Sequence, residues 1–90
     1  MSGSATSEGG LSRSENGRYL ALGCYDAAVA TASVASTTSA ANNRIVARID
    51  GGTGVDTSTR ISDAFSANNV RSATTVDGAN FWVAGAANGV

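Results

Sequence analysis

Apolar residues and one glycine follow Arg18 over residues 18–25, which read RYLALGCY, and they divide into two alternating sets. The odd-numbered positions fall on one face and the even-numbered positions on the other: Tyr19, Ala21 and Gly23 against Leu20, Leu22 and Cys24. A period of two residues is typical of a β-strand. The preceding Asn16-Gly17 pair predicts a tight turn, because glycine adopts positive φ without strain. With room for a short strand in LSRS before the turn, this stretch predicts a β-hairpin.

The same period recurs over residues 44–49, RIVARI. Its two faces carry different side chains: Ile45, Ala47 and Ile49 against Arg44, Val46 and Arg48. The sequence DGGTG at 50–54 predicts a turn, and the β-branched run at 55–61 predicts the next strand. We therefore expect a second hairpin, followed by a loop over 62–69 in which Phe65 is the one anchoring aromatic residue.

The order of features then begins again. Residues 70–76 read as a short strand, Asp77-Gly78 as a turn and residues 81–90 as a strand that starts with two aromatic residues. Gly17 and Gly78 lie 61 positions apart in the chain. The sequence thus predicts an internal repeat in which a second copy starts, and a unit of this kind needs neighbours to cover its sheet.

Small side chains without a strong period fill the segment between the two predicted hairpins. Asp26 has the chemistry to cap a short alanine-rich helix, but the Thr and Ser content and the Asn42-Asn43 end favour a loop over residues 27–43. This long loop is a feature that a four-stranded unit does not need. We expect it to contact a partner.

The motif SENGRYLALGCYDA, followed by RIVARID, resembles a blade of a β-propeller of the WD-repeat type. Ile49-Asp50 stands where that type has Trp-Asp, and no Gly-His pair precedes the second unit, so the resemblance extends to the propeller architecture alone. It implies an all-β fold with an antiparallel four-stranded propeller-like blade plus the first hairpin of a second blade. LSRS and VRSATTV would be the innermost strands of the two blades.

The implied organisation is a flexible leader at 1–10, a first repeat at 11–65 and the start of a second repeat at 66–90. A closed ring takes about four to eight blades. The resemblance therefore implies either a fragment of a larger propeller or a unit that assembles with copies of itself.

Composition limits the size of the core, and charge narrows the classes of partner. With two Phe, two Tyr and one Trp among 90 residues, large core side chains are few, and the core of a single unit is expected to be modest. The net charge is −1 and all six basic residues are Arg, so we expect neither a nucleic-acid nor a membrane partner. Residues 27–35 are too short and too rich in Thr and Ser to span a bilayer.

The side chains that carry chemistry are sparse. No His is present, which excludes Ser-His-Asp and Cys-His catalysis, and Cys24 is single and predicted to pack as a small apolar side chain. The carboxylates of Asp50, Asp56 and Asp63 show no spacing for paired acid–base work. Gly51–Thr59 partly matches a calcium-binding β-helix repeat, but its single copy and Ser58 at the apolar position favour a hairpin turn. We expect no catalytic residue, cofactor or metal site.

Phe81 and Trp82 could stack on a sugar or a peptide, although core packing between units is the favoured role. These points predict a non-catalytic binding or scaffolding segment of a propeller-like repeat protein, with other blades or copies of itself as partners and a protein or carbohydrate as ligand. Two alternatives stay open. The segment could support an enzyme whose catalytic residues lie in other blades, or it could be a Ser-, Thr- and Ala-rich surface adhesin repeat.

Overall fold

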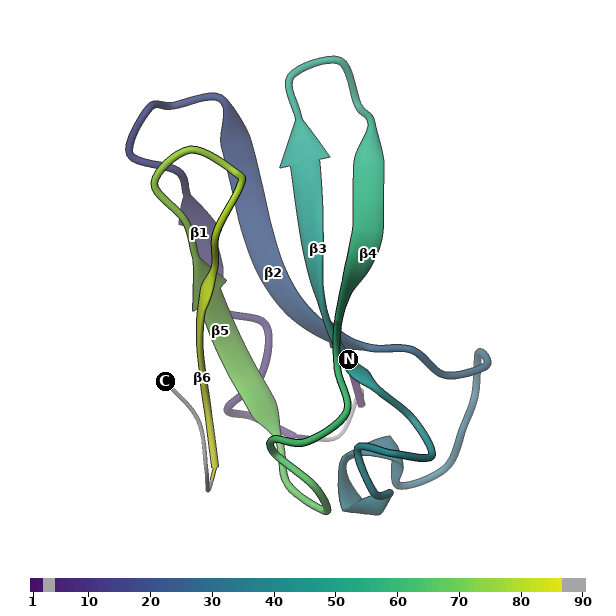
Figure 1. Cartoon of the computed structure of the whole chain (residues 1–90). Helices are drawn as coiled ribbons and strands as arrows, with labels where there is room; N and C mark the ends of the chain where they lie inside the picture. Colours follow the sequence, from purple (N-terminus) through teal and green to yellow (C-terminus); the bar gives the residue numbers. More distant parts are fainter. Residues whose placement is uncertain (3–4, 87–90) are drawn as a thin grey trace.

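The computed structural model describes residues 1–2 and 5–86 and shows an all-β protein (Figure 1). Its elements, in chain order, are β1 (Leu11–Arg13), β2 (Tyr19–Tyr25), the 3₁₀ turn η1 (Val34–Ser36), β3 (Arg44–Asp50), β4 (Val55–Ile61), β5 (Val70–Thr74) and β6 (Trp82–Gly85). The expected strands are present, although β5 ends two residues before the end of the predicted strand at 70–76, and residues 87–90 of the strand expected over 81–90 lie outside the described residues. No helix in the described part of the chain is long and apolar enough to cross a membrane.

Strands β1 to β4 form one antiparallel sheet in the order β1-β2-β3-β4, and β5 pairs with β6 in a separate antiparallel hairpin. In this sheet β2 and β3 pair over their full lengths, with Ala21 opposite Arg48 and Tyr25 opposite Arg44. The predicted division of RIVARI into two faces is confirmed. The face of β3 that carries Arg44, Val46 and Arg48 lies toward the β5–β6 hairpin. The hydrogen bond that Arg48 donates to the turn of that hairpin shows this orientation.

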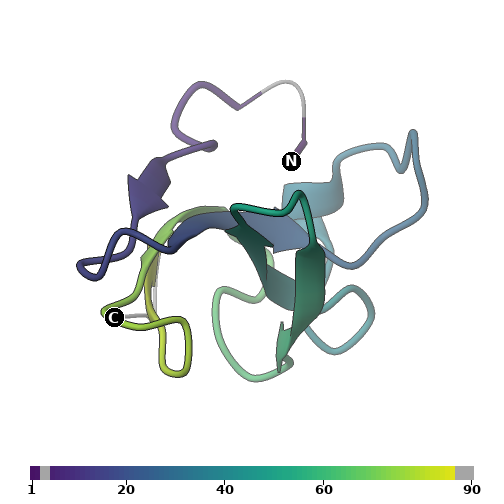
Figure 2. The same ribbon diagram turned by 90° about the horizontal axis from the view of Figure 1, so that it is seen from above.

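The β5–β6 hairpin lies beside the first hairpin, and Figure 2 shows the strands arranged in an arc. Strand β5 runs parallel to the start of β1, and a parallel β-bridge links Gly10, just before β1, to Ser72 of β5. The backbone N–H of Gly10 donates to the carbonyl of Arg71 at 3.1 Å, and the Ser12 hydroxyl donates to the carbonyl of Ala73 at 2.6 Å. The strands that occupy equivalent places in the two predicted repeats therefore lie side by side.

The turns of the two hairpins are built alike. Gly17 and Gly78 both have positive φ, 77° and 83°. The buried hydroxyl of Ser14 accepts a hydrogen bond from the backbone of Tyr19 at 3.0 Å, and the buried hydroxyl of Thr75 accepts one from Gly78 at 2.9 Å. A buried hydroxyl before a left-handed glycine therefore organises each turn.

The core lies between the four-stranded sheet and the hairpin. Its buried members come from strands and from two loops: Ala21, Tyr25, Val34, Val46, Phe65, Val70, Ala73 and Val83. Phe65 is the largest apolar side chain among them and is only 2% exposed, as its predicted anchoring role requires. Most of the others are Ala and Val, so the core is as modest as the composition indicates.

Residues 27–43 form a loop with a single 3₁₀ turn and no α-helix, which confirms the predicted loop. The chain before β1 also touches the domain. Glu8 accepts hydrogen bonds from Tyr25 and Asn69, and Gly10 bonds to Arg71. Contacts between the predicted leader and the folded part therefore begin before Leu11.

Candidate functional site

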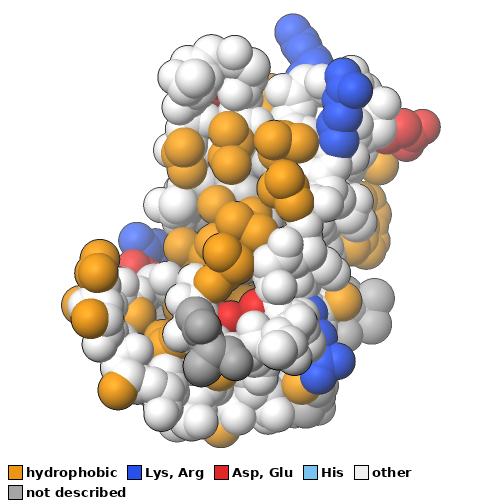
Figure 3. Space-filling view, turned by 180° about the vertical axis from the view of Figure 1, so that it is seen from behind, with side chains coloured by type: hydrophobic (Ala, Val, Ile, Leu, Met, Phe, Trp, Pro, Cys, Tyr) orange, Lys and Arg blue, Asp and Glu red, His pale blue; other side chains and the backbone are white. Residues whose placement is uncertain are grey.

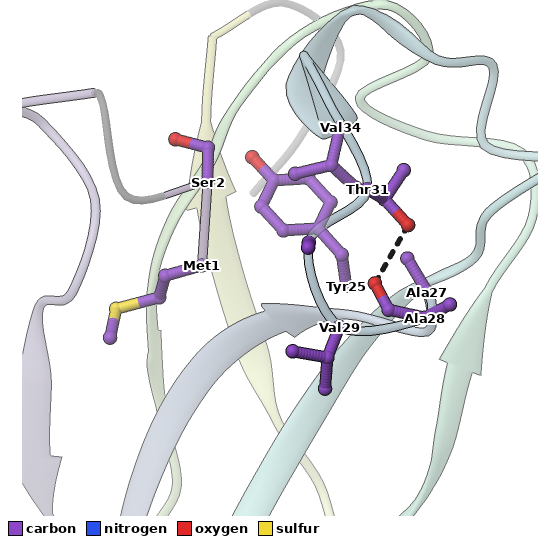
Figure 4. Close-up of a pocket in the computed structure, with 9 residues that line it drawn as sticks. Met1, Ser2, Tyr25, Ala27, Ala28, Val29, Thr31 and Val34 are labelled. Atoms are coloured by element: carbon purple, nitrogen blue, oxygen red, sulfur yellow. Dashed lines mark hydrogen bonds between the residues drawn. The ribbon is translucent and has the colours of Figure 1, made fainter.

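One hollow, of about 300 Å³, lies at the start of the long loop (Figure 4). Its walls come from the first residues of the chain, the end of β2 and the loop: Met1, Ser2, Tyr25, Ala27, Ala28, Val29, Ala30, Thr31 and Val34. The Thr31 hydroxyl donates to the carbonyl of Ala28 at 2.7 Å and holds the loop in a turn. Val29 is fully exposed at the rim. The lining side chains are mainly aliphatic, but about half of the exposed surface of the hollow is polar.

Beside this hollow, Tyr25 and Glu8 form a polar cluster. The Tyr25 hydroxyl donates to Glu8 and accepts from the backbone N–H of Val70 at 3.3 Å, while Asn69 donates to the same carboxylate at 2.9 Å. Burial, followed by the hydrogen bond to Glu8, raises the pKa of Tyr25 to about 12. Burial alone would raise the pKa of Glu8, but hydrogen bonds led by the Ser2 backbone lower it below its ordinary value. Glu8 is therefore an ionised acceptor at neutral pH.

Arg44 lies behind the loop and is fully buried. Its guanidinium donates to four backbone carbonyls, those of Ala35, Thr37, Asn42 and Asn68, at 2.8–3.0 Å. Neither of the two ion pairs in residues 1–2 and 5–86 includes it, and its Nε has no partner among those residues. Burial lowers the pKa of the guanidinium, which still remains charged at physiological pH. Loop carbonyls thus take the place of a counter-ion.

The second half of the long loop is therefore part of the fold, contrary to the expectation that the domain does not need it. Beyond the carbonyls on Arg44, it contributes the buried side chain of Val34 to the core. The Ser39 hydroxyl donates to Ser62 at 2.8 Å, and the carbonyl of Thr37 accepts from the backbone of Ala67 at 3.0 Å. The expected partner contact stays a prediction for the exposed residues near Val29.

A second hollow, of about 200 Å³, lies between β3–β4 and the turn of the β5–β6 hairpin. Its walls are Arg48, Asp56, Ser58, Thr59, Gly78, Ala79 and Phe81. Arg48 forms an ion pair with Asp56 at 3.2 Å and donates to the carbonyl of Gly78 at 2.9 Å. Hydrogen bonds from Ser58, followed by the Arg48 charge, lower the pKa of Asp56. This polar hollow lies between the four-stranded sheet and the β5–β6 hairpin, which the hydrogen bond from Arg48 to Gly78 connects.

The remaining carboxylates are held apart from one another. Asp50 accepts hydrogen bonds from the backbones of Gly52 and Gly54, both at 2.9 Å, and so closes the β3–β4 turn. The prediction of a hairpin turn at Gly51–Thr59 is therefore confirmed. Asp63 lies exposed in the loop after β4. Within the described residues, no group of three His, Cys, Asp or Glu side chains could hold a metal ion.

Cys24, Phe81 and Trp82 lie in different surroundings. Cys24 is half-buried on the outer face of β2, and burial raises the pKa of its thiol, so it is not an activated nucleophile. Phe81 packs against the core as predicted. Trp82 does not, because it points to the opposite face of β6 and is 50% exposed.

The outer face of the four-stranded sheet carries a hydrophobic patch, seen from behind in Figure 3. The strand register places its members on one face: Leu11, Leu20, Leu22, Cys24, Ile49 and Val55. Leu11 and Val55, at its two margins, are 57% and 62% exposed. We call these six residues the outer patch.

Sequence reasoning missed the buried Arg44 and the polar hollow around Arg48. Both arginines alternate with Val46 on one strand face, a pattern that also fits a solvated face. Comparison with known proteins gives no match: no protein-family model, no curated protein and no solved structure matches this chain. Its function has to be inferred from its own residues.

Proposed function

We propose that this chain is a non-catalytic β-repeat segment of propeller-like type, which binds and scaffolds by associating with further units of its own kind. The observation that carries the proposal is the parallel placement of β1 beside β5, with the hydrogen bond from Ser12 to Ala73 joining positions 61 residues apart. Repeat proteins grow by stacking equivalent elements in this way.

The exposed surfaces support association. Strands β4 and β6 end the two sheets, and an unpaired strand edge is a template for further pairing. The outer patch and the half-exposed Trp82 add apolar surface that a neighbouring unit would cover.

A propeller also requires a particular packing of faces between neighbouring units. Units related by rotation pack unlike faces on one another when they form a ring. Here Ala21 and Val83, at equivalent positions of the two hairpins, both face the same core. Closing a ring therefore requires the β5–β6 hairpin to present its Trp82 face, in place of its Val83 face, to the four-stranded sheet. Trp82 fluorescence would detect this change of packing. In a longer chain with two more strands after β6, burial of Trp82 should shift its emission to the blue and protect it from a soluble quencher.

The solution mass of the 90-residue chain, measured by light scattering over a range of concentrations, tests association directly. We expect a discrete oligomer with a β-type circular dichroism spectrum. Val55→Glu, at the margin of the outer patch, should shift the oligomer toward monomer, whereas Ala40→Glu on the exposed loop should not. A folded monomer at every concentration would contradict the proposal.

A further inference from the structure

We infer that the hollow between β3–β4 and the β5–β6 turn is a binding site for a neutral, hydroxyl-rich ligand of the size of one sugar ring. This inference goes beyond association with like units and does not depend on it, because every wall of the hollow comes from a single chain.

A β-bulge builds the polar side of the site. Val46 pairs with Thr59 and Arg48 pairs with Asp56, so two residues of β4 oppose the single Ala47 of β3. Without the extra residue, the alternation of β4 would place Asp56 on the outer face. The bulge turns its carboxylate to the face that carries Arg48. Bulges are enriched beside functional sites because they redirect side chains in this way.

The charge of the site is balanced. The Asp56 carboxylate lies 3.2 Å from the Arg48 guanidinium and offsets its positive charge. The pair therefore attracts neither a free anion nor a free cation strongly. It still offers carboxylate oxygens as acceptors and guanidinium N–H groups as donors, and the carbonyl of Gly78 adds an acceptor. Adjacent hydroxyl groups, each both donor and acceptor, match such a set.

Size completes the match, and Phe81 adds a small apolar contact. The Phe81 side chain is partly buried against the core and lines one edge of the hollow, where it can contact C–H groups of a sugar ring. Tyr19 holds the guanidinium in place from the other side, with the Arg48 Cζ 4.9 Å from its ring centroid. A volume of about 200 Å³ lies below the roughly 300–1,000 Å³ of pockets for drug-sized ligands, which limits the occupant to about one ring.

The site also lies where two structural units meet, a preferred place for ligand pockets. Arg48, Asp56 and Thr59 belong to the four-stranded sheet, whereas Gly78 and Phe81 belong to the second hairpin. A ligand that contacts both would tie the hairpin to the sheet and stabilise the folded chain.

Amide NMR shifts of the full chain, titrated with methyl glycosides of glucose, galactose and mannose, test the inference. At least one glycoside should shift the amides of Arg48, Asp56 and Gly78, with a dissociation constant in the range of about 1 mM or weaker, as befits a small open site. Sodium acetate and guanidinium chloride at equal concentration should not shift the same amides in a saturable way.

Two variants separate binding from folding. Asp56→Asn should weaken glycoside binding about tenfold or more by removing a charged acceptor, while Asp26→Asn, in the other surface ion pair, should leave it unchanged. Ala79→Tyr, which fills the hollow from an exposed position and leaves the ion pair intact, should abolish binding in a chain that is still folded by circular dichroism.

The inference is overturned if no glycoside gives saturable shifts at these residues, if acetate binds there as well as a glycoside, or if Ala79→Tyr binds like the unmodified chain. None of these outcomes alters the solution mass, so failure of this inference is distinguishable from failure of the association proposal.

Discussion

The guanidinium of Arg44 lies over the ring of Tyr25, with its Cζ atom 5.0 Å from the ring centroid, and both side chains are buried. A charged group in this position keeps its charge only if the surroundings replace the water it has lost. The aromatic face and four backbone carbonyls do so here. The contact couples the long loop, strand β3 and the loop after Phe65 into one structural unit.

Replacing Arg44 by lysine should lower the free energy of unfolding by about 2–4 kcal/mol, because an ammonium group cannot span carbonyls that a planar guanidinium reaches in several directions. Urea denaturation measures this loss. Arg60→Lys is the matched control, since Arg60 pairs with Asp26 on the surface and exposed pairs contribute little. Equal effects of the two substitutions would show that the buried arginine is not a structural centre.

The Tyr25 hydroxyl should make the fold sensitive to alkali. Its pKa rises from 10.0 to about 12 on folding, so the folded state binds more protons than the unfolded state between these values. Its stabilising contribution is therefore complete below about pH 10 and is lost as the pH rises through about 12. Thermal melts at pH 9 and near pH 11 should show a fall in Tm that is smaller in Tyr25→Phe. An identical fall in both proteins would assign the alkaline transition to other groups.

Glu8 should act at the other end of the pH scale. Its pKa is lowered in the folded state from an ordinary value of 4.5, so its contribution is present above that value and is lost as the pH falls through the folded pKa. In Glu8→Gln, melts between about pH 5 and pH 3 should show a shallower loss of stability than in the unmodified chain. The result expected for a truly detached leader is different: the two proteins would have the same acid profile.

The two left-handed turn glycines should differ in their tolerance of alanine. A Cβ atom at Gly78 would lie 2.6 Å from the Tyr19 ring, whereas at Gly17 it would meet only the Arg13 side chain, at 3.0 Å. Gly17→Ala should cost about 1 kcal/mol for the positive φ alone, and Gly78→Ala about 3 kcal/mol, since the ring must also move. Chemical denaturation of both variants measures the difference. Similar losses would mean that the two turns are packed alike.

Cys24 should react slowly with iodoacetamide at pH 8, because burial raises its pKa and reduces the thiolate fraction. Unfolding in urea should accelerate the reaction. If association covers the outer patch, the rate in the absence of urea should also fall as the protein concentration rises. A rate equal to that of the unfolded chain at all concentrations would show that the patch stays open.

Several local features follow from the sequence alone. The period of two in residues 18–25 and 44–49 determines strands with two distinct faces, because successive side chains of an extended chain point to opposite sides. Asn16-Gly17, Asp50–Gly54 and Asp77-Gly78 determine turns, because glycine and short polar side chains satisfy the conformations that turns need. The all-β class and the recurrence of a hairpin after 61 residues are consequences of these local rules.

Which face of each strand enters the core was decided only by the tertiary structure. In RIVARI, the arginine-bearing face of β3 turns inward, because loop carbonyls distant in sequence satisfy Arg44 and the turn at Gly78 accepts from Arg48. The β4 bulge beside Asp56 likewise depends on how β3 and β4 align, and no single residue of either strand predicts that alignment. Local periodicity is a property of the backbone, whereas the burial of a charge depends on partners that folding brings together.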